Sequence, residues 1–275
     1  MNSIMENLII IRGGGDIATG TIHKLHRCGF PVLVLETFRP SAIRRCVSFS
    51  EAVYDGLSEV EGVTCRLADS IEPALEIIGA GDVAMIVDDR CCVLERIKPL
   101  ALIDCIMAKK NLGANKDMAP ITIALGPGFT AGKDADLVIE TMRGHDLGRI
   151  IDKGKASEDT EEPGSIDGFT IERVIYSAHS GVLHSISRIG DCVKKGQTIA
   201  VIRSDDAEYQ VDAAISGILR GLIREGFRVE KGLKIADIDP RESERNNCFT
   251  ISDKARCIAG SVLEGLLWLK LKVES

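Results

Sequence analysis

The stretch Ile11-Arg12-Gly13-Gly14-Gly15-Asp16-Ile17-Ala18 decides the fold of the first half of this chain. It follows an apolar run and opens an amphipathic segment, and it fits the pattern G-x-G-x-x-G/A with Ala18 in the third position. Gly13 suits a tight turn, and Gly15 lets a diphosphate approach the backbone. Because the free amides of a helix N-terminus attract anions, we expect Gly13, Gly14 and Gly15 to bind a phosphate group.

Short apolar segments alternate with helical ones from residue 8 to residue 142, which is typical of a parallel sheet with helices on both faces. The predicted strands are Leu8–Ile11, Val32–Leu35, Val63–Leu67, Val83–Val87, Ile121–Leu125 and Leu137–Glu140. The predicted helices are Ile17–Cys28, Ile71–Ile78 and Leu100–Asn111. The pattern predicts an α/β class with a Rossmann-like doubly wound sheet. Its ligands should lie outside the carboxyl ends of the strands, where the first predicted strand adjoins the fourth.

Two acidic residues bear on what the loop binds. Glu36 ends the second predicted strand about 20 residues after Gly15, where a carboxylate binds the ribose hydroxyls of NAD. Asp16 lies in the first helical turn, where its charge satisfies the helix dipole but repels a phosphate on the same amides. The string Gly-Gly-Gly-Asp-Ile-Ala nevertheless resembles the nucleotide loop of the NAD-dependent siroheme-synthase dehydrogenases. Two readings stay open: the loop binds NAD(P) or another nucleotide, or it is a glycine turn that binds nothing.

Further polar residues follow the predicted strands and are candidates for the same edge of the sheet. Arg44 and Arg45 can clamp an oxyanion bidentately, although a solvated helix end explains them equally well. The other candidate cofactor-binding residues are Gly126, Gly128 and Arg143. If the protein is an oxidoreductase, the candidate catalytic residues are Asp89, Cys91 and His145.

The composition excludes several classes of protein. A net charge of −7 without a basic stripe argues against nucleic acid as a partner. No apolar run approaches the ~20 residues that span a membrane, and the N-terminus lacks the basic region of a signal peptide. The nine cysteines form no C-x-x-C motif or zinc spacing, so we expect a reduced, cytoplasmic protein without a structural metal. Most cysteines should be core residues, with a reactive Cys91 or Cys92 as the alternative.

The second half begins after a polar segment, residues 153–172, which we interpret as a linker between a first domain, residues 1–152, and a β module, residues 173–240. The module repeats itself: Ser180–Ile202 placed over Ser216–Ile238, an offset of 36 residues, gives 11 identities in 23 positions. Two such copies should pack against each other. The pattern resembles the biotinyl/lipoyl domain, a barrel-sandwich hybrid. Asp206 stands where that family carries its modified lysine, so the resemblance implies no lipoate or biotin.

The last segment, residues 249–272, predicts a helix that packs on a domain or on a second subunit, which leaves a homo-oligomer possible. Its apolar stripe consists of Ala255, Ile258, Ala259, Val262, Leu263, Leu266, Leu267 and Trp268. Core packing is the favoured reading of this stripe.

The chain as a whole resembles the YqeB-like family of accessory proteins of the selenium-dependent molybdenum hydroxylase system. The resemblance is carried by residues 12–20, Arg44-Arg45, residues 49–54, 108–113, 125–129 and 139–148. It implies that the protein matures a molybdenum hydroxylase, with the apoenzyme or other maturation factors as partners and a nucleotide-containing ligand at the glycine loop. Two alternatives stay open: an NAD(P)-dependent oxidoreductase, and a non-catalytic scaffold for the target hydroxylase.

Overall fold

A computed structural model describes residues 2–160, 164 and 166–274, and it divides the chain into two compact units. Unit 1 consists of residues 1–40, 48–160 and 251–275, and unit 2 consists of residues 41–47 and 161–250. The C-terminal helix therefore belongs to the unit of the glycine loop. A short segment from the first half of the chain belongs instead to the β module.

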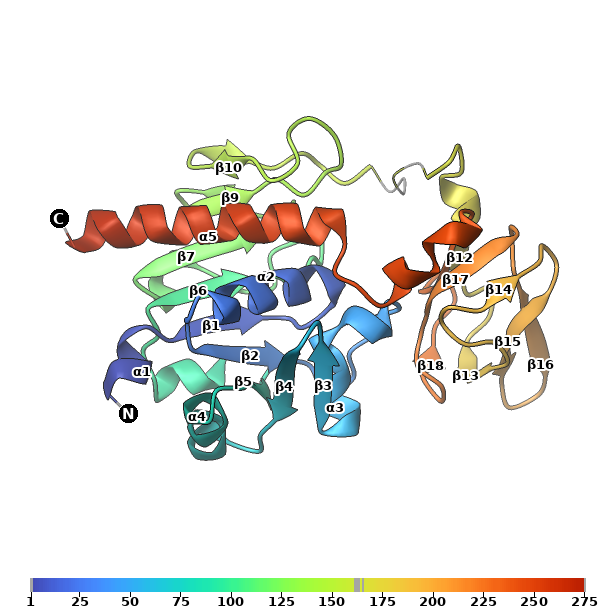
Figure 1. The fold of residues 1–275 in the computed structure, drawn as a ribbon, viewed down its shortest axis with the longest axis horizontal. Coiled ribbons are helices and arrows are strands. Elements are labelled where there is room, and N and C mark those ends of the chain that lie inside the picture. Colours follow the sequence, from blue (N-terminus) through green and yellow to red (C-terminus); the bar gives the residue numbers. More distant parts are fainter. Residues whose placement is uncertain (1, 161–163, 165, 275) are drawn as a thin grey trace. The chain divides into compact units, whose positions relative to one another are not determined.

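Unit 1 is built on a mixed sheet of nine strands, and the chain has an α/β architecture here (Figure 1). The strands, in chain order, are β1 (Ile9–Arg12), β2 (Val32–Glu36), β3 (Leu57–Val60), β4 (Val63–Leu67), β5 (Val83–Val87), β6 (Ala101–Asp104), β7 (Ile121–Leu125), β9 (Leu137–Ile139) and β10 (Ile150–Ile151). Their spatial order is β10-β9-β7-β6-β1-β2-β5-β4-β3. All neighbours are parallel except the two edge pairs, β3–β4 and β9–β10. The strands β8 (Thr130–Ala131) and β11 (Gly154–Lys155) form a separate small sheet.

The order corrects two expectations. The predicted fourth strand, now β5, lies between β2 and β4, so it does not adjoin β1. The neighbour of β1 is β6, in a segment for which we expected a helix over Leu100–Asn111. All four residues of β6 are buried, because both faces of the sheet are covered there. A central strand buried on both faces has no polar alternation, and from sequence it is easily confused with a buried helix.

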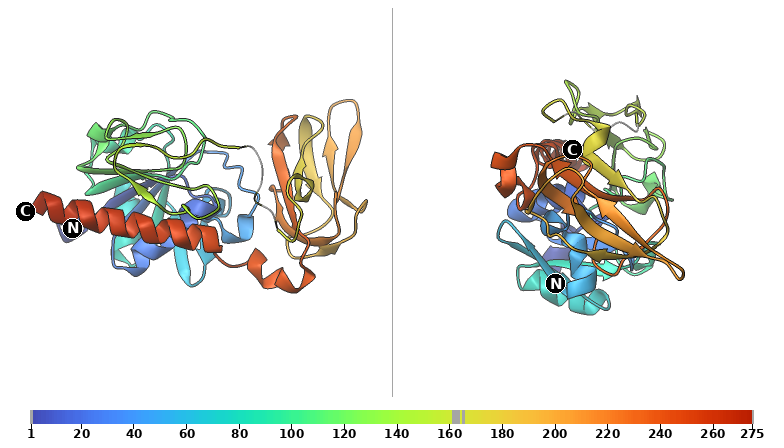
Figure 2. Two further views of the ribbon diagram at one scale, coloured as in Figure 1. Left: turned by 90° about the horizontal axis from the view of Figure 1, so that it is seen from above. Right: turned by 90° about the vertical axis from the view of Figure 1, so that its right-hand side faces the viewer.

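Helices cover both faces of this sheet. They are α1 (Asn2–Glu6), α2 (Asp16–Arg27), α3 (Ala52–Asp55), α4 (Ile71–Gly79) and α5 (Asp253–Glu274). The helices α2 and α5 lie side by side over one face, and Figure 2 shows the same pairing from a second direction. On the other face, α4 and the segment after β5 enclose a core that includes Leu8, Ile10 and Leu102.

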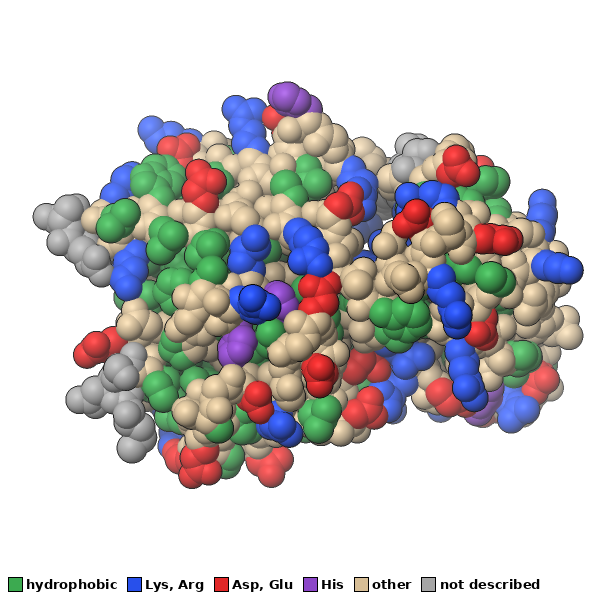
Figure 3. Space-filling model, viewed as in Figure 1, with side chains coloured by type: hydrophobic (Ala, Val, Ile, Leu, Met, Phe, Trp, Pro, Cys, Tyr) green, Lys and Arg blue, Asp and Glu red, His purple; other side chains and the backbone are tan. Residues whose placement is uncertain are grey.

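Close contact between α2 and α5 depends on Gly20. A Cβ at this position would lie 2.8 Å from Ala255 Cβ, so the two helices approach at the level of their backbones. The apolar stripe of α5 is buried as far as Leu266 except for the half-buried Leu263, but Leu267 and Trp268 are exposed, contrary to the expectation of core packing. Because Leu266, one position earlier, is fully buried, Leu267 and Trp268 are exposed through their place on the side of α5 that faces away from the core. Figure 3 shows apolar side chains gathered over this end of α5.

Unit 2 consists of two four-stranded antiparallel sheets, β12-β19-β17-β14 and β16-β15-β13-β18. The strands are β12 (Val174–Tyr176), β13 (Gly181–Ser185), β14 (Cys192–Val193), β15 (Thr198–Arg203), β16 (Glu208–Asp212), β17 (Gly217–Leu222), β18 (Arg228–Val229) and β19 (Lys234–Asp239). Three of them, β13, β14 and β15, begin 36 residues before β17, β18 and β19, as the repeat predicts.

Equivalent hydrogen bonds connect the two copies of the repeat. The amide of Lys195 donates to Ser216 Oγ at 2.9 Å, and the amide of Lys231 donates to Ser180 Oγ at 3.1 Å. Between them the sheets enclose one apolar core. The prediction that the copies pack against each other is therefore confirmed.

Several 3₁₀ helices complete the chain and occupy connections rather than the two cores. They are Arg45–Val47, Phe49–Glu51, Cys92–Glu95, Lys116–Met118, Ile171–Arg173 and Glu242–Cys248.

Candidate functional site

The carboxyl ends of the parallel strands of unit 1 meet at one edge of the sheet, which we call the rim. The strands β1, β2 and β5 bring the glycine loop, Glu36 and residues 88–92 to this rim. The strands β6, β7 and β9 bring Asp104, the loop after Leu125, and residues 140–143. Because β6 adjoins β1, Asp104 lies beside the glycine loop, a position that sequence reasoning missed.

The three glycines of the loop have different surroundings. At Gly13, φ is +91°, and a Cβ would lie 3.2 Å from Ile106 Cα on the neighbouring rim segment. At Gly14, a Cβ would lie 2.9 Å from Met85 Cε and 3.0 Å from Ser50 N. At Gly15, no described atom outside the two neighbouring residues lies within 4 Å of a Cβ, and φ is −65°. The protein's own packing therefore requires Gly13 and Gly14, whereas Gly15 faces open space.

Gly15 is also the residue that precedes α2 and begins its hydrogen-bonding pattern. The amide of Thr19 donates to Gly15 O at 2.8 Å, and Gly15, as the N-cap residue, has no side chain that could cap the helix. The first amides of a helix carry the positive end of its dipole. An open surface at this end can therefore accept an anionic group.

Glu36 binds the glycine loop itself. Its carboxylate accepts hydrogen bonds from Gly14 N at 2.7 Å and from Thr37 N at 2.8 Å. Burial raises the pKa of Glu36, against the effect of these two amides. The carboxylate thus fixes the loop, and the amide of Gly14 is occupied by the protein rather than available to a phosphate.

Beneath the loop, Arg12 and Asp104 form a buried ion pair. Arg12 Nη1 donates to Asp104 Oδ2 at 2.7 Å, and Arg12 Nη2 donates to Leu112 O at 3.1 Å. The two residues are only 4 % and 2 % exposed. The pair therefore joins the carboxyl ends of the neighbouring strands β1 and β6 at the rim.

The thiol of Cys91 lies against this pair but is poorly suited to be a nucleophile. Cys91 is buried, and burial raises its pKa to about 11, although the Arg12 guanidinium works in the opposite direction. The neighbouring Cys92 is exposed, and the Asp88 carboxylate raises its pKa as well. Because the thiolate is the reactive form of cysteine, neither residue is activated at neutral pH.

We therefore predict that Cys91 resists alkylation in the native protein. With iodoacetamide at neutral pH, mass spectrometry should find Cys28, which is exposed, modified well before Cys91. In urea the two thiols should react at similar rates, which serves as the control. Rapid labelling of native Cys91 would contradict the account of its environment.

All nine cysteines are free thiols in the structure. Five of them are exposed, so the expectation that most are core residues is wrong. The buried ones are Cys65, Cys91, Cys105 and Cys248.

At the end of β9, Glu140 organises the neighbouring loops. Its Oε1 accepts hydrogen bonds from Thr141 N at 2.7 Å and Met142 N at 2.8 Å, and its Oε2 accepts one from Ser157 N at 2.7 Å. Burial acts to raise the pKa of Glu140, but these amides outweigh it, so the pKa is lowered. The ionised carboxylate holds this part of the rim together.

We predict that Glu140→Gln destabilises the protein by about 2 kcal/mol at pH 7, because the amide group accepts fewer hydrogen bonds and leaves an N–H unpaired. Folding lowers the pKa of Glu140, so its contribution is present above 4.5, the ordinary value. It is lost as the pH falls through the lower pKa of the folded protein. Urea unfolding of both proteins should therefore show a difference in the free energy of unfolding at pH 7 that narrows as the pH falls below 4.5. A difference in the free energy of unfolding that widens in acid would contradict this reasoning.

Arg143 pairs with the start of α5. Its guanidinium donates to both carboxylate oxygens of Asp253, at 2.9 and 3.1 Å. Pairing with a residue 110 positions away was not visible in the sequence.

Lys254 is a rim residue that sequence reasoning missed. It follows Asp253 in α5 and faces Arg143, Asp16, Asp159 and Glu140. Burial lowers its pKa, and the Arg143 charge adds to this effect. No motif in the sequence marks Lys254, because the sequence does not show which part of α5 lies near the rim.

Arg44 and Arg45 are held within unit 2. Arg44 Nη2 donates to Asn247 O at 2.9 Å and to Thr250 O at 3.3 Å, and Arg45 Nε donates to Leu222 O at 2.8 Å. These bonds attach segment 41–47 to the β module. The structure thus gives both arginines a structural role, in place of the expected oxyanion clamp beside Glu36.

The other candidates from the sequence lie on the rim in varied settings. Asp89 and His145 are exposed, and no described partner orients either of them as an acid or base. Gly126 and Gly128 permit close contacts within the protein, since a Cβ would lie 2.6 Å from Thr141 Oγ1 or from Lys110 Cα, respectively. Packing is therefore sufficient to explain these two glycines.

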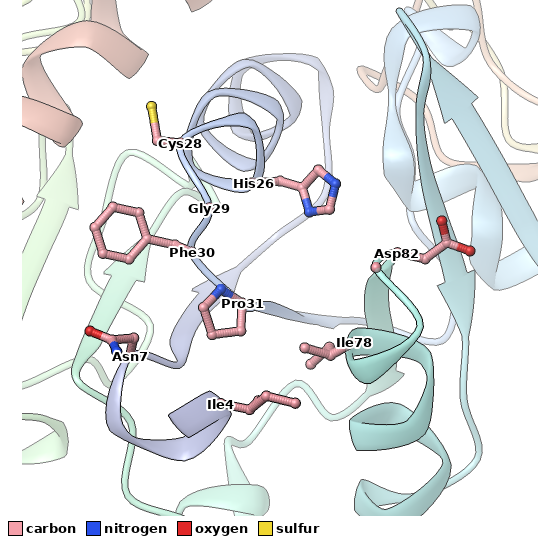
Figure 4. A pocket seen from close by; sticks show the side chains of 10 residues that line it. Ile4, Asn7, His26, Cys28, Gly29, Phe30, Pro31, Ile78 and Asp82 are labelled. Carbon is pink, nitrogen blue, oxygen red and sulfur yellow. The ribbon is translucent and has the colours of Figure 1, made fainter. Parts of the chain in front are cut away.

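A pocket of about 470 Å³ lies at the opposite edge of the sheet, near the amino ends of β1, β2 and β5 (Figure 4). Ile4, Pro31 and Ile78 line its apolar part, and His26 and Asp82 stand on one side. Ligands of open α/β sheets bind at the carboxyl ends of the strands, so this pocket is not part of the rim.

Two further features concern the whole described chain. No three His, Cys, Asp or Glu side chains within it are grouped so that they could hold a metal ion. Within the same residues, no helix combines the length and hydrophobicity needed to cross a membrane.

The fold and the rim define a class of protein: an α/β unit with a glycine-loop rim, joined to a biotinyl/lipoyl-like β domain. The family described as "Biotin-requiring enzyme" matches residues 172–238. The chain is 48 % identical over 264 residues to the "Uncharacterized protein YqeB" of Escherichia coli (strain K12). The match covers 96 % of this chain and 48 % of that protein, so the chain spans about half the length of this relative.

Solved structures show weaker similarity. The product-bound ectoine utilization protein EutE (DoeB) from Ruegeria pomeroyi is 10 % identical, with a TM-score of 0.25, over 84 % of this chain and 56 % of that one. A succinylglutamate desuccinylase/aspartoacylase from Rhodobacter sphaeroides is 9 % identical, with a TM-score of 0.30, over 86 % and 85 %. Scores this low do not establish a shared fold.

Proposed function

We propose that this protein is an accessory factor that matures a selenium-dependent molybdenum hydroxylase, and that its rim binds a nucleotide-containing ligand. The ligand is the molybdenum cofactor in its dinucleotide form, an adenine nucleotide or NAD(P). The maturation role rests on the sequence resemblance to YqeB-like proteins, and the hydroxylase apoenzyme or another maturation factor is then the partner.

The observation that carries ligand binding is the open face of Gly15. The protein's own atoms lie close to Gly13 and Gly14, whereas Gly15, the N-cap residue of α2, has no atom within 4 Å of a Cβ apart from those of its two chain neighbours. A phosphate group fits such a place because the helix dipole and the backbone amides both favour an anion.

Titration of the purified full chain with NAD, NADP, ATP and a molybdenum-cofactor dinucleotide tests this function. We expect saturable binding of at least one of them by calorimetry. Binding of NAD with hydride transfer to or from a substrate would favour the oxidoreductase instead. If none of the four binds, the nucleotide-binding proposal fails.

One observation favours the alternative of a non-catalytic scaffold. Packing alone explains four of the five candidate glycines, so a binding role is needed only for Gly15. In unit 2, Asp206 lies in the exposed turn between β15 and β16, and its carboxylate cannot form the amide that attaches lipoate or biotin. A β domain without a prosthetic group is suited to docking the target hydroxylase, and co-purification of that enzyme without nucleotide binding would support this alternative.

A further inference from the structure

The last turns of α5 are apolar on nearly every side. Residues 262–271 read VLEGLLWLKL, in which seven of ten residues are apolar. A surface helix usually carries polar residues on the side that faces water, whereas a helix that is apolar all round is buried all round. The sequence of this end of α5 is therefore suited to burial on two sides.

Unit 1 covers one of these two sides. There Leu266 is fully buried, and a Cβ at Gly265 would lie 2.9 Å from Leu137 Cδ1 of β9. Leu267 and Leu271 lie one turn apart on the outer side, where they are 44 % and 67 % exposed. Helix geometry places Leu267 about 160° around the axis from Gly265. Unit 1 thus leaves the outer side of this helix end uncovered.

Trp268 and Lys272 extend the uncovered surface. Trp268, the single tryptophan of the chain, is 37 % exposed, and Lys272 Nζ lies 4.1 Å from the centroid of its ring. We call Leu267, Trp268, Leu271 and Lys272 the α5 patch. Large apolar side chains gathered at a surface mark an interaction site, and tryptophan is among the residues that contribute most to protein–protein binding.

The α5 patch is separate from the rim. Asp253 begins α5 at the rim, where it pairs with Arg143. Leu267 lies about 21 Å further along the helix, at a rise of about 1.5 Å per residue. A nucleotide at the rim therefore neither covers this patch nor depends on it.

The longer relative indicates what covers the patch. The match to this chain takes up 48 % of the YqeB protein of Escherichia coli, so slightly more than half of that protein lies outside the match. Parts of one polypeptide meet at an effective concentration of about a millimolar, at which a modest apolar surface is enough for stable contact. A second copy of this chain is a less suitable cover, because each copy carries a net charge of −7.

We propose that the α5 patch binds a protein domain that corresponds to the unmatched part of this longer relative. The inference goes beyond nucleotide binding, and it holds whether that domain is carried on the same polypeptide, as in the relative, or on a separate one. The domain should offer an apolar groove for Leu267, Trp268 and Leu271, bordered by a carboxylate that meets Lys272.

The first test labels the full chain with 5-fluorotryptophan, which gives one fluorine resonance, at Trp268. The unmatched part of the relative, produced as a separate protein, should shift or broaden this resonance saturably. Leu271→Glu should weaken the binding by about tenfold or more, because it puts a charge into the apolar contact. Leu57→Glu is the matched control at a leucine of β3 that is 47 % exposed in the same unit, and it should bind as the original chain does.

The intact relative gives a second readout, which does not depend on how its parts fold alone. Hydroxyl-radical footprinting, corrected for residue type, should modify Trp268 and Leu271 of this chain several times faster than the aligned residues of the intact relative. Equal rates would overturn the proposal, whatever the titration shows. Dimerisation of this chain alone that Leu271→Glu abolishes would also overturn it, because a second copy would then cover the patch.

Discussion

Gly15→Val should weaken the binding of a nucleotide by about 100-fold or more while leaving the fold unchanged, since losing each charge-assisted hydrogen bond costs about 1.5–3 kcal/mol. The valine side chain would occupy the free space in front of the start of α2, where we place the phosphate. Its Cβ meets no described atom within 4 Å, and the backbone conformation suits any residue. Calorimetric titration combined with urea unfolding measures both effects.

Gly260→Val is the matched control for this variant. Gly260 lies in α5 of the same unit, and a Cβ there also meets no described atom within 4 Å. We expect Gly260→Val to bind as the unmodified protein does. Full binding by a folded Gly15→Val variant would show that the ligand does not use this loop.

Asp104→Leu should destabilise unit 1 by about 3–5 kcal/mol, because it leaves the guanidinium of Arg12 buried without its counter-ion. The ion pair is almost inaccessible to water, with an Nη1–Oδ2 distance of 2.7 Å. Urea-induced unfolding followed by circular dichroism measures the loss, with unit 2 as an internal reference if the two units unfold separately.

The double variant Arg12→Met/Asp104→Leu separates the ion pair from packing. Replacing a buried pair by apolar side chains is often nearly neutral, so the double variant should recover most of the stability that Asp104→Leu loses. A double variant as unstable as the single one would instead indicate that the shape of these side chains, rather than their charge, holds β1 and β6 together.

Much of the fold follows from local patterns in the sequence. The glycine loop, α2 and all six predicted strands are present, because short apolar runs between Gly, Pro and Asp residues predict buried parallel strands. The repeat in unit 2 is equally clear, since two similar segments must fold alike and bury one face against each other. Both signals come from short stretches of sequence: each predicted strand is a run of a few residues, and each copy of the repeat has 23.

The rest depends on contacts that no local pattern reveals. β6 reads as a helix because a strand covered on both faces shows no alternation. The assignment of segment 41–47 to unit 2 results from bonds of Arg44 and Arg45 to carbonyl groups about 200 residues away. The close packing of α5 on α2, which are more than 200 positions apart in the sequence, depends on the small size of Gly20. Long-range packing determined the site more than the sequence motif did.

A crystal of the full chain soaked with ADP tests the central claim most directly. We predict electron density for the diphosphate in front of Gly15, at the start of α2. Density for ADP in the pocket at the opposite edge of the sheet, with the space before Gly15 filled only by solvent, would contradict the account.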